Sequence, residues 1–209
     1  MKKPAFANLL SCTVLGLFLT GCLSKPALVE KSFAFQTPAT THAVTGNGVG
    51  TLVVPPVEVS PLFSKQDLVY RIGPNEYETD PYAGFLVLPD QSLTIPIRSY
   101  LAGSGLFANV VWPDSLIKPD KVLQVYVTEL YGDFRDAKQP AAVLAMRVVF
   151  ANFGGDVILQ KEYSRHLTIK KNTAEAVVAG WNQALDEIMA ELASDLNSAP
   201  KSVEKGPVP

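Results

Sequence analysis

The sequence predicts an α/β (α+β) fold in which an antiparallel or mixed sheet packs against a long C-terminal helix and a shorter first helix. Three consecutive segments, 122–131, 141–151 and 157–169, are rich in apolar and β-branched residues, and a short glycine-containing segment separates the last two. This pattern is typical of antiparallel strands that follow one another in the chain. Residues 172–196 then carry apolar side chains at steps of three and four, which is the spacing of an amphipathic helix.

The N-terminus is built like an export signal. Lys2 and Lys3 precede an apolar run over residues 5–19, which is shorter than the roughly twenty residues that a membrane-spanning helix needs. The run ends in the four residues Leu19, Thr20, Gly21 and Cys22. This ending resembles the lipobox of bacterial lipoproteins, which implies that residues 1–21 are a signal peptide and that Cys22 becomes the first residue, as an S-diacylglycerol, N-acyl cysteine. The alternative is an ordinary secretory signal that contains a cysteine by chance.

Cleavage before Cys22 would leave 188 residues, enough for one domain with a sizeable core. These residues include 16 Lys and Arg against 20 Asp and Glu, a net charge of −4. Without a basic run, nucleic acid is not an expected partner. The other cysteine, Cys12, lies within the signal, so stability must come from apolar burial rather than a disulfide. No second apolar run approaches membrane-spanning length, and we expect a protein that is anchored to a membrane without crossing it.

The first part of the exported chain alternates between strand-like and flexible segments. Residues 31–36 predict a short strand with Phe33 and Phe35 on one face. Residues 37–50 are rich in Thr, Gly, Ala and Asn and predict a flexible connection. The glycines at 46–50 lack the preceding strand and following helix of a phosphate-binding turn, so we expect a loop there.

A broken strand and a hairpin come next. Residues 51–59 predict a strand that is interrupted at Pro55-Pro56, because proline cannot donate to a sheet ladder. Residues 68–72 and 76–79 flank a Gly-Pro-Asn turn, which predicts a hairpin. We expect Asp80-Pro81 to end the second strand.

Residues 92–101 predict the shorter helix, with apolar residues at steps of four. Ser92 is the expected N-cap, and Pro96 then falls in the first turn or just past it, where a missing N–H costs least. The sequence Gly103-Ser104-Gly105 is expected to end the helix. Residues 110–112 predict a short strand.

The last part of the chain contains the strongest patterns. Residues 122–131 alternate between apolar and polar side chains, whereas residues 141–151 are nearly all apolar, as in a central strand that is buried on both faces. Asn172 is the expected N-cap of the long helix, with Glu175 completing a capping box. Residues 197–209 have no period and predict a disordered tail.

Few groups are suited to catalysis. His42 lies in the flexible connection, and His166 lies on a predicted strand with Arg165 directed to the opposite face. The sequence contains neither a Gly-x-Ser-x-Gly elbow nor a histidine pair at a metal-binding spacing. Three carboxylates share one face of a predicted strand, where we expect solvation rather than a cation site: Glu76, Glu78 and Asp80. We therefore expect no catalytic, cofactor-binding or metal-binding residues.

The order of these features resembles the ABC-type transport auxiliary lipoprotein family, over about residues 31–196. A lipobox is followed by four motifs in sequence: Val53-Val54-Pro55-Pro56-Val57, Asp67-Leu68-Val69-Tyr70-Arg71, Gly105-Leu106-Phe107 and the strand series that leads into the long helix. The paraquat-inducible branch of this family includes a lipoprotein that works beside a mammalian-cell-entry-domain transporter. One segment departs from the family pattern, because Gly84-Phe85-Leu86-Val87 stands where members usually carry a Trp-Ala-Glu-Pro-like sequence.

The resemblance implies a non-catalytic lipoprotein on the periplasmic face of the outer membrane of a Gram-negative bacterium. Its partners would be a mammalian-cell-entry-domain protein or other ABC transport components, with a homo-oligomer also allowed, and it would dock a lipid-transport tube and support envelope integrity. Leu23 and Ser24 follow Cys22 in place of the aspartate that commonly retains lipoproteins at the inner membrane. Two alternatives are a lipid- or solute-binding lipoprotein with its own cavity, and an envelope hydrolase that uses His166.

The predicted organisation has four parts. Residues 1–21 are the signal peptide, and 22–50 are the lipidated N-terminus with its tether and first short strand. Residues 51–196 form the transport auxiliary domain, and 197–209 form the tail.

Overall fold

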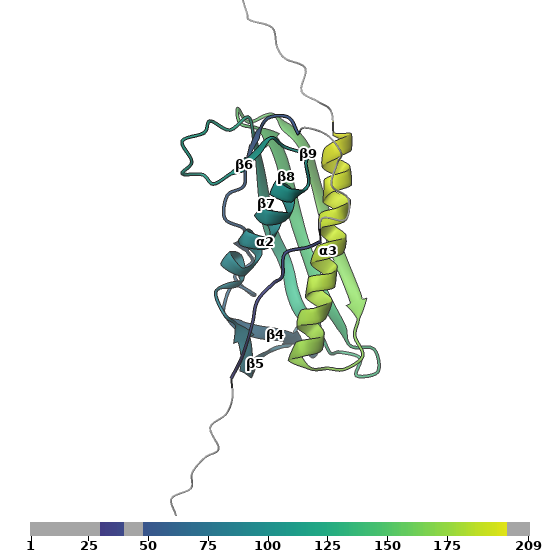
Figure 1. Cartoon of the computed structure of the whole chain (residues 1–209). Coiled ribbons are helices and arrows are strands. Elements are labelled where there is room, and N and C mark those ends of the chain that lie inside the picture. The colour runs from purple at the N-terminus through teal and green to yellow at the C-terminus, as the bar shows by residue number, and fades with distance from the viewer. Residues whose placement is uncertain (1–29, 40–47, 200–209) are drawn as a thin grey trace, which may run out of the picture.

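The computed structural model of the protein describes residues 30–39 and 48–199. Within these ranges the chain forms one mixed sheet of nine strands together with two helices (Figure 1). The elements in chain order are β1 (Lys31–Phe33), β2 (Thr51–Val53), β3 (Glu58–Val59), β4 (Asp67–Arg71), β5 (Tyr77–Phe85), α2 (Pro89–Gly103), β6 (Asn109–Val111), β7 (Lys121–Asp133), β8 (Ala141–Asn152), β9 (Val157–Thr168) and α3 (Ala174–Ser198). The predicted α+β class, with a long C-terminal helix and a shorter first helix, is confirmed.

Three long antiparallel strands form the centre of the sheet. β8 pairs with β7 on one side, where Leu144 lies opposite Leu130, and with β9 on the other, where Leu144 lies opposite Arg165. Most of the side chains on β8 are buried, because the strand is central and long apolar runs are stable only when covered on both faces. The predicted antiparallel series and the central position of residues 141–151 are both confirmed.

The other edge of β7 is paired by three short parallel strands in succession. β2 pairs at Lys121, β3 at Tyr126 and β4 at Gly132. The gap between β2 and β3 contains Pro55-Pro56, as predicted. Beyond the prolines the Val57 N–H donates to the Thr94 hydroxyl of α2 at 2.9 Å, so a donor freed from the ladder is satisfied by a helix side chain.

The predicted hairpin is present, but its second strand does not end at Asp80-Pro81. β5 continues to Phe85. The register between β4 and β5 shifts between Asp67 and Val69, which pair with Gly84 and Thr79. Pro81 therefore lies in a stretch that does not need to donate to β4, and β5 then pairs with β1 from Ala83 onward.

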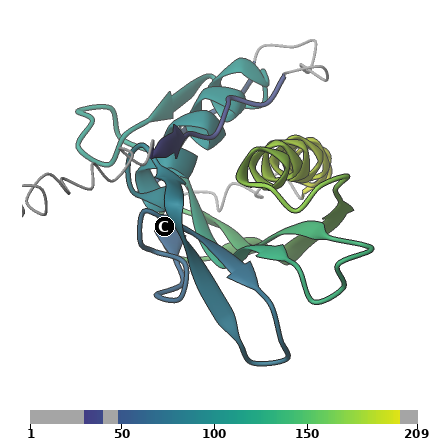
Figure 2. The same cartoon turned by 90° about the horizontal axis from the view of Figure 1, so that it is seen from below.

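Both helices lie on the same face of the sheet, as the view along α3 shows (Figure 2). α2 begins three residues before the expected N-cap, because Pro89 supplies a backbone angle suited to the first helical position. The prediction of Ser92 as N-cap is wrong: Ser92 is buried within the helix. Pro96 is consequently deeper in the helix than expected.

α3 also begins and ends slightly later than predicted. Thr173, rather than Asn172, is the N-cap, and its hydroxyl accepts from the Ala176 N–H at 3.4 Å. Glu175 forms an ion pair with Lys31 at 2.6 Å. The helix includes residues 197 and 198, which the sequence placed in the tail, while 200–209 lie outside the described residues.

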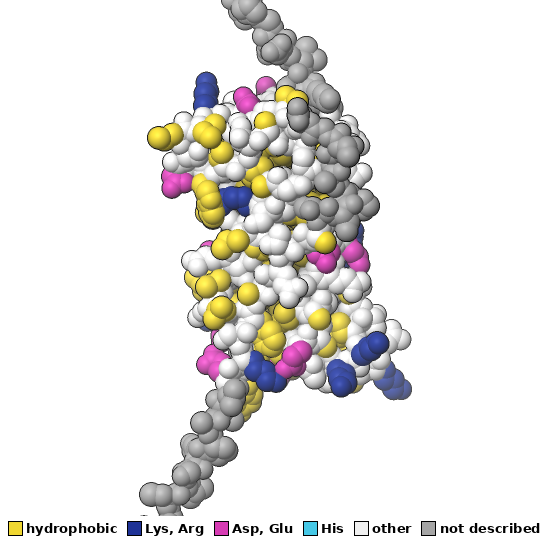
Figure 3. All heavy atoms as spheres, viewed as in Figure 1, with side chains coloured by type: hydrophobic (Ala, Val, Ile, Leu, Met, Phe, Trp, Pro, Cys, Tyr) yellow, Lys and Arg dark blue, Asp and Glu magenta, His cyan; other side chains and the backbone are white. Residues whose placement is uncertain are grey.

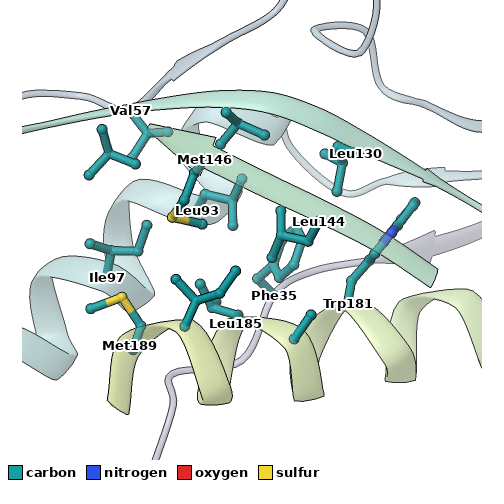
Figure 4. Packing of buried hydrophobic residues seen from close by; sticks show 14 of the residues in the cluster. Phe35, Val57, Leu93, Ile97, Leu130, Leu144, Met146, Trp181, Leu185 and Met189 are labelled. Atoms are coloured by element: carbon teal, nitrogen blue, oxygen red, sulfur yellow. The ribbon is translucent and has the colours of Figure 1, made fainter. Parts of the chain in front are cut away.

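The main core lies between the central strands and the two helices (Figure 4). Trp181 is fully buried there, and its indole N–H is shared between the carbonyl oxygens of Val143 at 3.0 Å and Tyr131 at 3.3 Å. Next to it the helix backbone approaches the sheet closely, since a Cβ at Gly180 would lie 2.5 Å from Ala142 Cβ. The tryptophan thus fixes α3 on β7 and β8 by both packing and hydrogen bonding.

We expect Trp181→Ala to lower the free energy of unfolding by about 3–5 kcal/mol, because it opens a cavity in the core. Trp181→Phe keeps most of the ring and should lose less, mainly the hydrogen bonds of the indole at about 1–2 kcal/mol. Urea unfolding of the exported chain measures both values. An alanine variant within 1 kcal/mol of the wild type would show that this contact does not hold the helix.

Candidate functional site

The predicted lipid-attachment residue Cys22 and the rest of the lipobox lie outside the described residues, as does His42. The structure instead shows how the chain that follows the lipobox joins the domain. We refer to residues 30–39 as the N-terminal strap. It begins at the end of the molecule that carries β4 and β5 and runs between α2 and α3 (Figure 1).

Aromatic side chains seat the strap in the core. Phe35 is 9% exposed and stacks on Phe85 of β5 at 5.8 Å between ring centroids and on Trp181 of α3 at 6.3 Å. Phe85 in turn stacks on Trp181 at 5.7 Å. The strap is therefore an integral part of the fold. The predicted strand over residues 31–36 is only half as long as expected, because β1 ends at Phe33 and Phe35 lies beyond it, packed in the core.

Backbone hydrogen bonds tie the strap to both helices. The Phe35 N–H donates to the Ser92 hydroxyl of α2 at 3.1 Å. The Gln36 N–H donates to the Asn182 side-chain oxygen of α3 at 2.7 Å. Ser92 thus helps to hold the strap on α2 by accepting this hydrogen bond, a role that its position in the helical pattern could not indicate.

An open groove of about 450 Å³ runs along the strap and α3. Its lining includes Phe33, Gln36, Val178, Asn182 and Asp186. The groove is at the surface, whereas side chains fill the space between the sheet and the helices (Figure 4). In this part of the chain, the volume between sheet and helix that a lipid-binding cavity would use is taken up by the core.

Charged side chains join β9 to α3. Glu191 accepts hydrogen bonds from Arg165 at 2.7 Å and from Lys161 at 2.8 Å, and these bonds, with Arg165 the larger cause, hold the pKa of Glu191 below its ordinary value. Asp195 accepts from Lys161 at 2.7 Å and from the hydroxyl of Tyr163 at 2.8 Å. Burial is the main reason that the pKa of Tyr163 is raised. This network fastens the helix to the strand.

The remaining candidate residues are not brought together. His166 is exposed on the face of β9 opposite to Arg165. Asp80 accepts a hydrogen bond from the Tyr70 hydroxyl at 2.7 Å. Among residues 30–39 and 48–199, no group of three His, Cys, Asp or Glu side chains is arranged to hold a metal ion.

A surface that the sequence did not predict lies on the exposed side of α2. It is composed of seven hydrophobic side chains, and we call it the α2 face: Leu86, Val87, Leu88, Ile95, Trp112, Leu116 and Ile117. Figure 3 shows hydrophobic side chains gathered over α2 and the loop after β6. Six of these residues lie in loops and only Ile95 lies in a helix. No helical or strand period marks the loop residues, so only their apolar character within Pro- and Asp-containing segments could have indicated them.

The described residues contain no helix that is long and apolar enough to cross a membrane.

We expect the α3–β9 network to make stability depend on pH. Because the pKa of Glu191 is lowered by folding, its contribution is present above about pH 4.5, the ordinary value, and is lost as the pH falls through the folded-state value. Glu191→Gln should cost about 1 kcal/mol at pH 7, and its difference from the wild type should shrink on acidification.

Urea unfolding at a series of pH values measures this difference. Glu162→Gln is the matched control, because Glu162 lies on the opposite face of β9 in a solvent-exposed pair with Arg147. A Glu191→Gln penalty that is equally large at pH 3 would contradict the assignment.

Comparison with solved structures supports the fold. Protein XCC0632 from Xanthomonas campestris, described as a DUF330 protein, superposes with a TM-score of 0.67 at 19% identity, covering 80% of this chain and 93% of its own. An uncharacterized protein superposes with a TM-score of 0.65 at 18% identity, covering 80% and 99%. The hypothetical protein CT253 from Chlamydia trachomatis gives 0.53 at 12% identity, covering 72% and 99%.

No curated protein matches this sequence. The sequence model of one family matches residues 33–193, which include most of the strap, the whole of α2, most of α3 and every strand apart from the first two residues of β1. The chain belongs to the ABC-type transport auxiliary lipoprotein component family.

Proposed function

We propose that this protein is an outer-membrane lipoprotein that docks an intermembrane lipid-transport system through its folded surface, without catalysis. Membership of a family of transport auxiliary lipoproteins carries the proposal. Its partners would be a mammalian-cell-entry-domain protein or other ABC transport components. Cys22 would carry the lipid, and the domain would face the periplasm.

The strap supports the role of an anchored docking subunit. Residues 23–30 span at most about 26 Å when fully extended, and Lys31 begins the strand that pairs with β5. Because Phe35 is packed in the core, the anchor would be connected to a rigid part of the domain. An anchored domain would then stay close to the bilayer and could meet the end of a tube from the inner membrane, but could not bridge the periplasm alone.

The α2 face supports docking to a protein. Leu116 and Leu86 are among its most exposed side chains, and apolar side chains that gather on a surface mark interaction sites more often than apolar side chains that are scattered singly. His166 lies away from the α2 face, on the exposed face of β9. The geometry therefore favours a binding surface over a reaction site.

The groove along the strap supports a second candidate, a lipoprotein that binds a lipid or solute. Its apolar contributors, Phe33 and Val178, are accompanied by polar ones such as Asn182 and Asp186. Mass spectrometry of the purified exported domain separates the two functions, since a carrier would retain a stoichiometric lipid and a docking subunit would not.

We expect Cys22→Ala to abolish membrane attachment. Two or three acyl chains on one residue bind a bilayer effectively permanently, whereas a single chain binds only marginally. Fractionation at high salt should find the variant soluble or uncleaved. A variant that is cleaved and still sediments with membranes would show that another anchor exists.

We expect Leu23→Asp to move the protein towards the inner membrane and to prevent complementation of a deletion strain, while its thermal unfolding stays unchanged. Ser24→Thr, a substitution one residue further on that adds no charge, is the matched control and should complement fully. Full complementation by a Leu23→Asp protein that fractionation places in the inner membrane would rule out the docking role.

A further inference from the structure

Arg98 of α2 is a buried cation without an acidic partner. It is 6% exposed, and its Nη2 donates to the Val54 carbonyl oxygen. Its Nε and Nη1 atoms have no hydrogen-bond partner among the described residues. No carboxylate of residues 30–39 or 48–199 forms an ion pair with it, and Asp114 acts on it only at longer range. A buried charge that lacks an anionic partner and has two unpaired donors is only partly compensated by one carbonyl oxygen.

The cover over this charge is a partly exposed aromatic ring. The Arg98 guanidinium lies 3.0 Å from the centroid of the Trp112 ring. Trp112 is 49% exposed and lies just after β6, at the start of the loop that leads to β7. Rotation of this one side chain would open the guanidinium to an approaching group.

The surroundings of Arg98 are apolar. Ile95 lies three residues earlier on α2, so the two side chains are neighbours on the helix surface, and Ile95 is 57% exposed. Leu116 and Ile117 follow Trp112 in the same loop and are also exposed. The unpaired charge thus lies beneath the α2 face.

We propose that the α2 face binds a protein partner that inserts an Asp or Glu carboxylate, flanked by apolar side chains, at Arg98. A carboxylate is the expected group because it is complementary in charge to the guanidinium and can accept hydrogen bonds from Nε and Nη1 of Arg98, which have no acceptor in the described residues. The exposed apolar residues around Trp112 indicate that the ligand is a protein, since apolar side chains on a partner's surface would bury them. The inference deepens the proposed function and rests on it in taking the partner to be a component of the transport system.

Burial also lowers the pKa of Arg98 to about 10, with Asp114 opposing the shift. The side chain is therefore still charged at neutral pH. A carboxylate from the partner would restore the favourable environment that the isolated domain lacks, so the same residue that weakens the free domain strengthens the complex.

Photo-cross-linking in cells tests the proposal with the full chain. A photoreactive residue at Ile95 probes the α2 face, and the same residue at Glu162, exposed on β9, is the matched control. We expect the Ile95 probe alone to capture a protein, in a segment that carries an acidic residue among apolar ones. Arg98→Met should reduce that adduct by at least about tenfold.

A charge exchange identifies the contact. Arg98→Glu should abolish the adduct, and replacing the mapped acidic residue of the partner by Arg should restore it. An adduct that persists undiminished in Arg98→Met, or one that extracts into organic solvent as a lipid, would overturn the proposal.

Thermal unfolding separates this role from a structural one. Removing a buried charge that has no anionic partner should leave the melting temperature of purified Arg98→Met unchanged or raise it by about 2–8 °C. A fall of similar size would show that Arg98 stabilises the free domain and would overturn the inference. An Arg98-dependent adduct to a protein that belongs to no transport system would support the inference about the α2 face. The same result would refute the proposed function.

Discussion

The packing of α3 on the central strands is the constraint on which the other parts of the structure depend. The helix lies close to the sheet because Gly180 presents no side chain to Ala142. Trp181 then occupies the space beside this contact and shares its indole N–H between two strand carbonyls. Phe85 and Phe35 stack on the same ring, so the placement of both β5 and the strap follows from where α3 lies.

The strap and the α2 face lie beside each other, because the Leu86 N–H donates to the Phe33 carbonyl oxygen at 2.7 Å. The strap enters beside β4 and β5 and is held by Ser92 on the buried side of α2. Ile95 projects from the exposed side of the same helix. Because Ser92 and Ile95 are three residues apart, they are neighbours on α2, and this one short helix holds the strap and presents an apolar surface on adjacent faces.

Strong periodic patterns predicted much of the fold. The helix caps and the end of β5 were not predicted correctly. The central strands and the long helix were predicted because their patterns run over ten or more residues. Ser92 and Asn172 were misassigned as caps because several residues near each helix start could serve. The Ser92 hydroxyl instead accepts a hydrogen bond from the Phe35 N–H, and Thr173 caps α3. The continuation of β5 past Pro81 required knowledge of the register shift, which depends on residues distant in the chain.

Less of the candidate site could be predicted. The lipid-attachment residue was visible in the sequence because peptidase recognition depends on local residues, and it remains a prediction outside the described chain. The α2 face was not visible, since exposure of Ile95 and Leu116 results from the packing of other elements. Arg98 gave no signal either, because a lone arginine on an amphipathic helix is ordinarily solvated, and only the fold places Trp112 over it.

The parallel pairing of β1 with β5 gives the domain a defined mechanical response. If the membrane anchor precedes the strap, tension on it acts along the axis of β1. The strand-to-strand hydrogen bonds, including the one from the Leu86 N–H to the Phe33 carbonyl oxygen at 2.7 Å, are then loaded in shear and share the force instead of opening one at a time. Tension on this end of the chain would therefore be resisted first by the pairing of β1 with β5 and then by the aromatic contacts of Phe35.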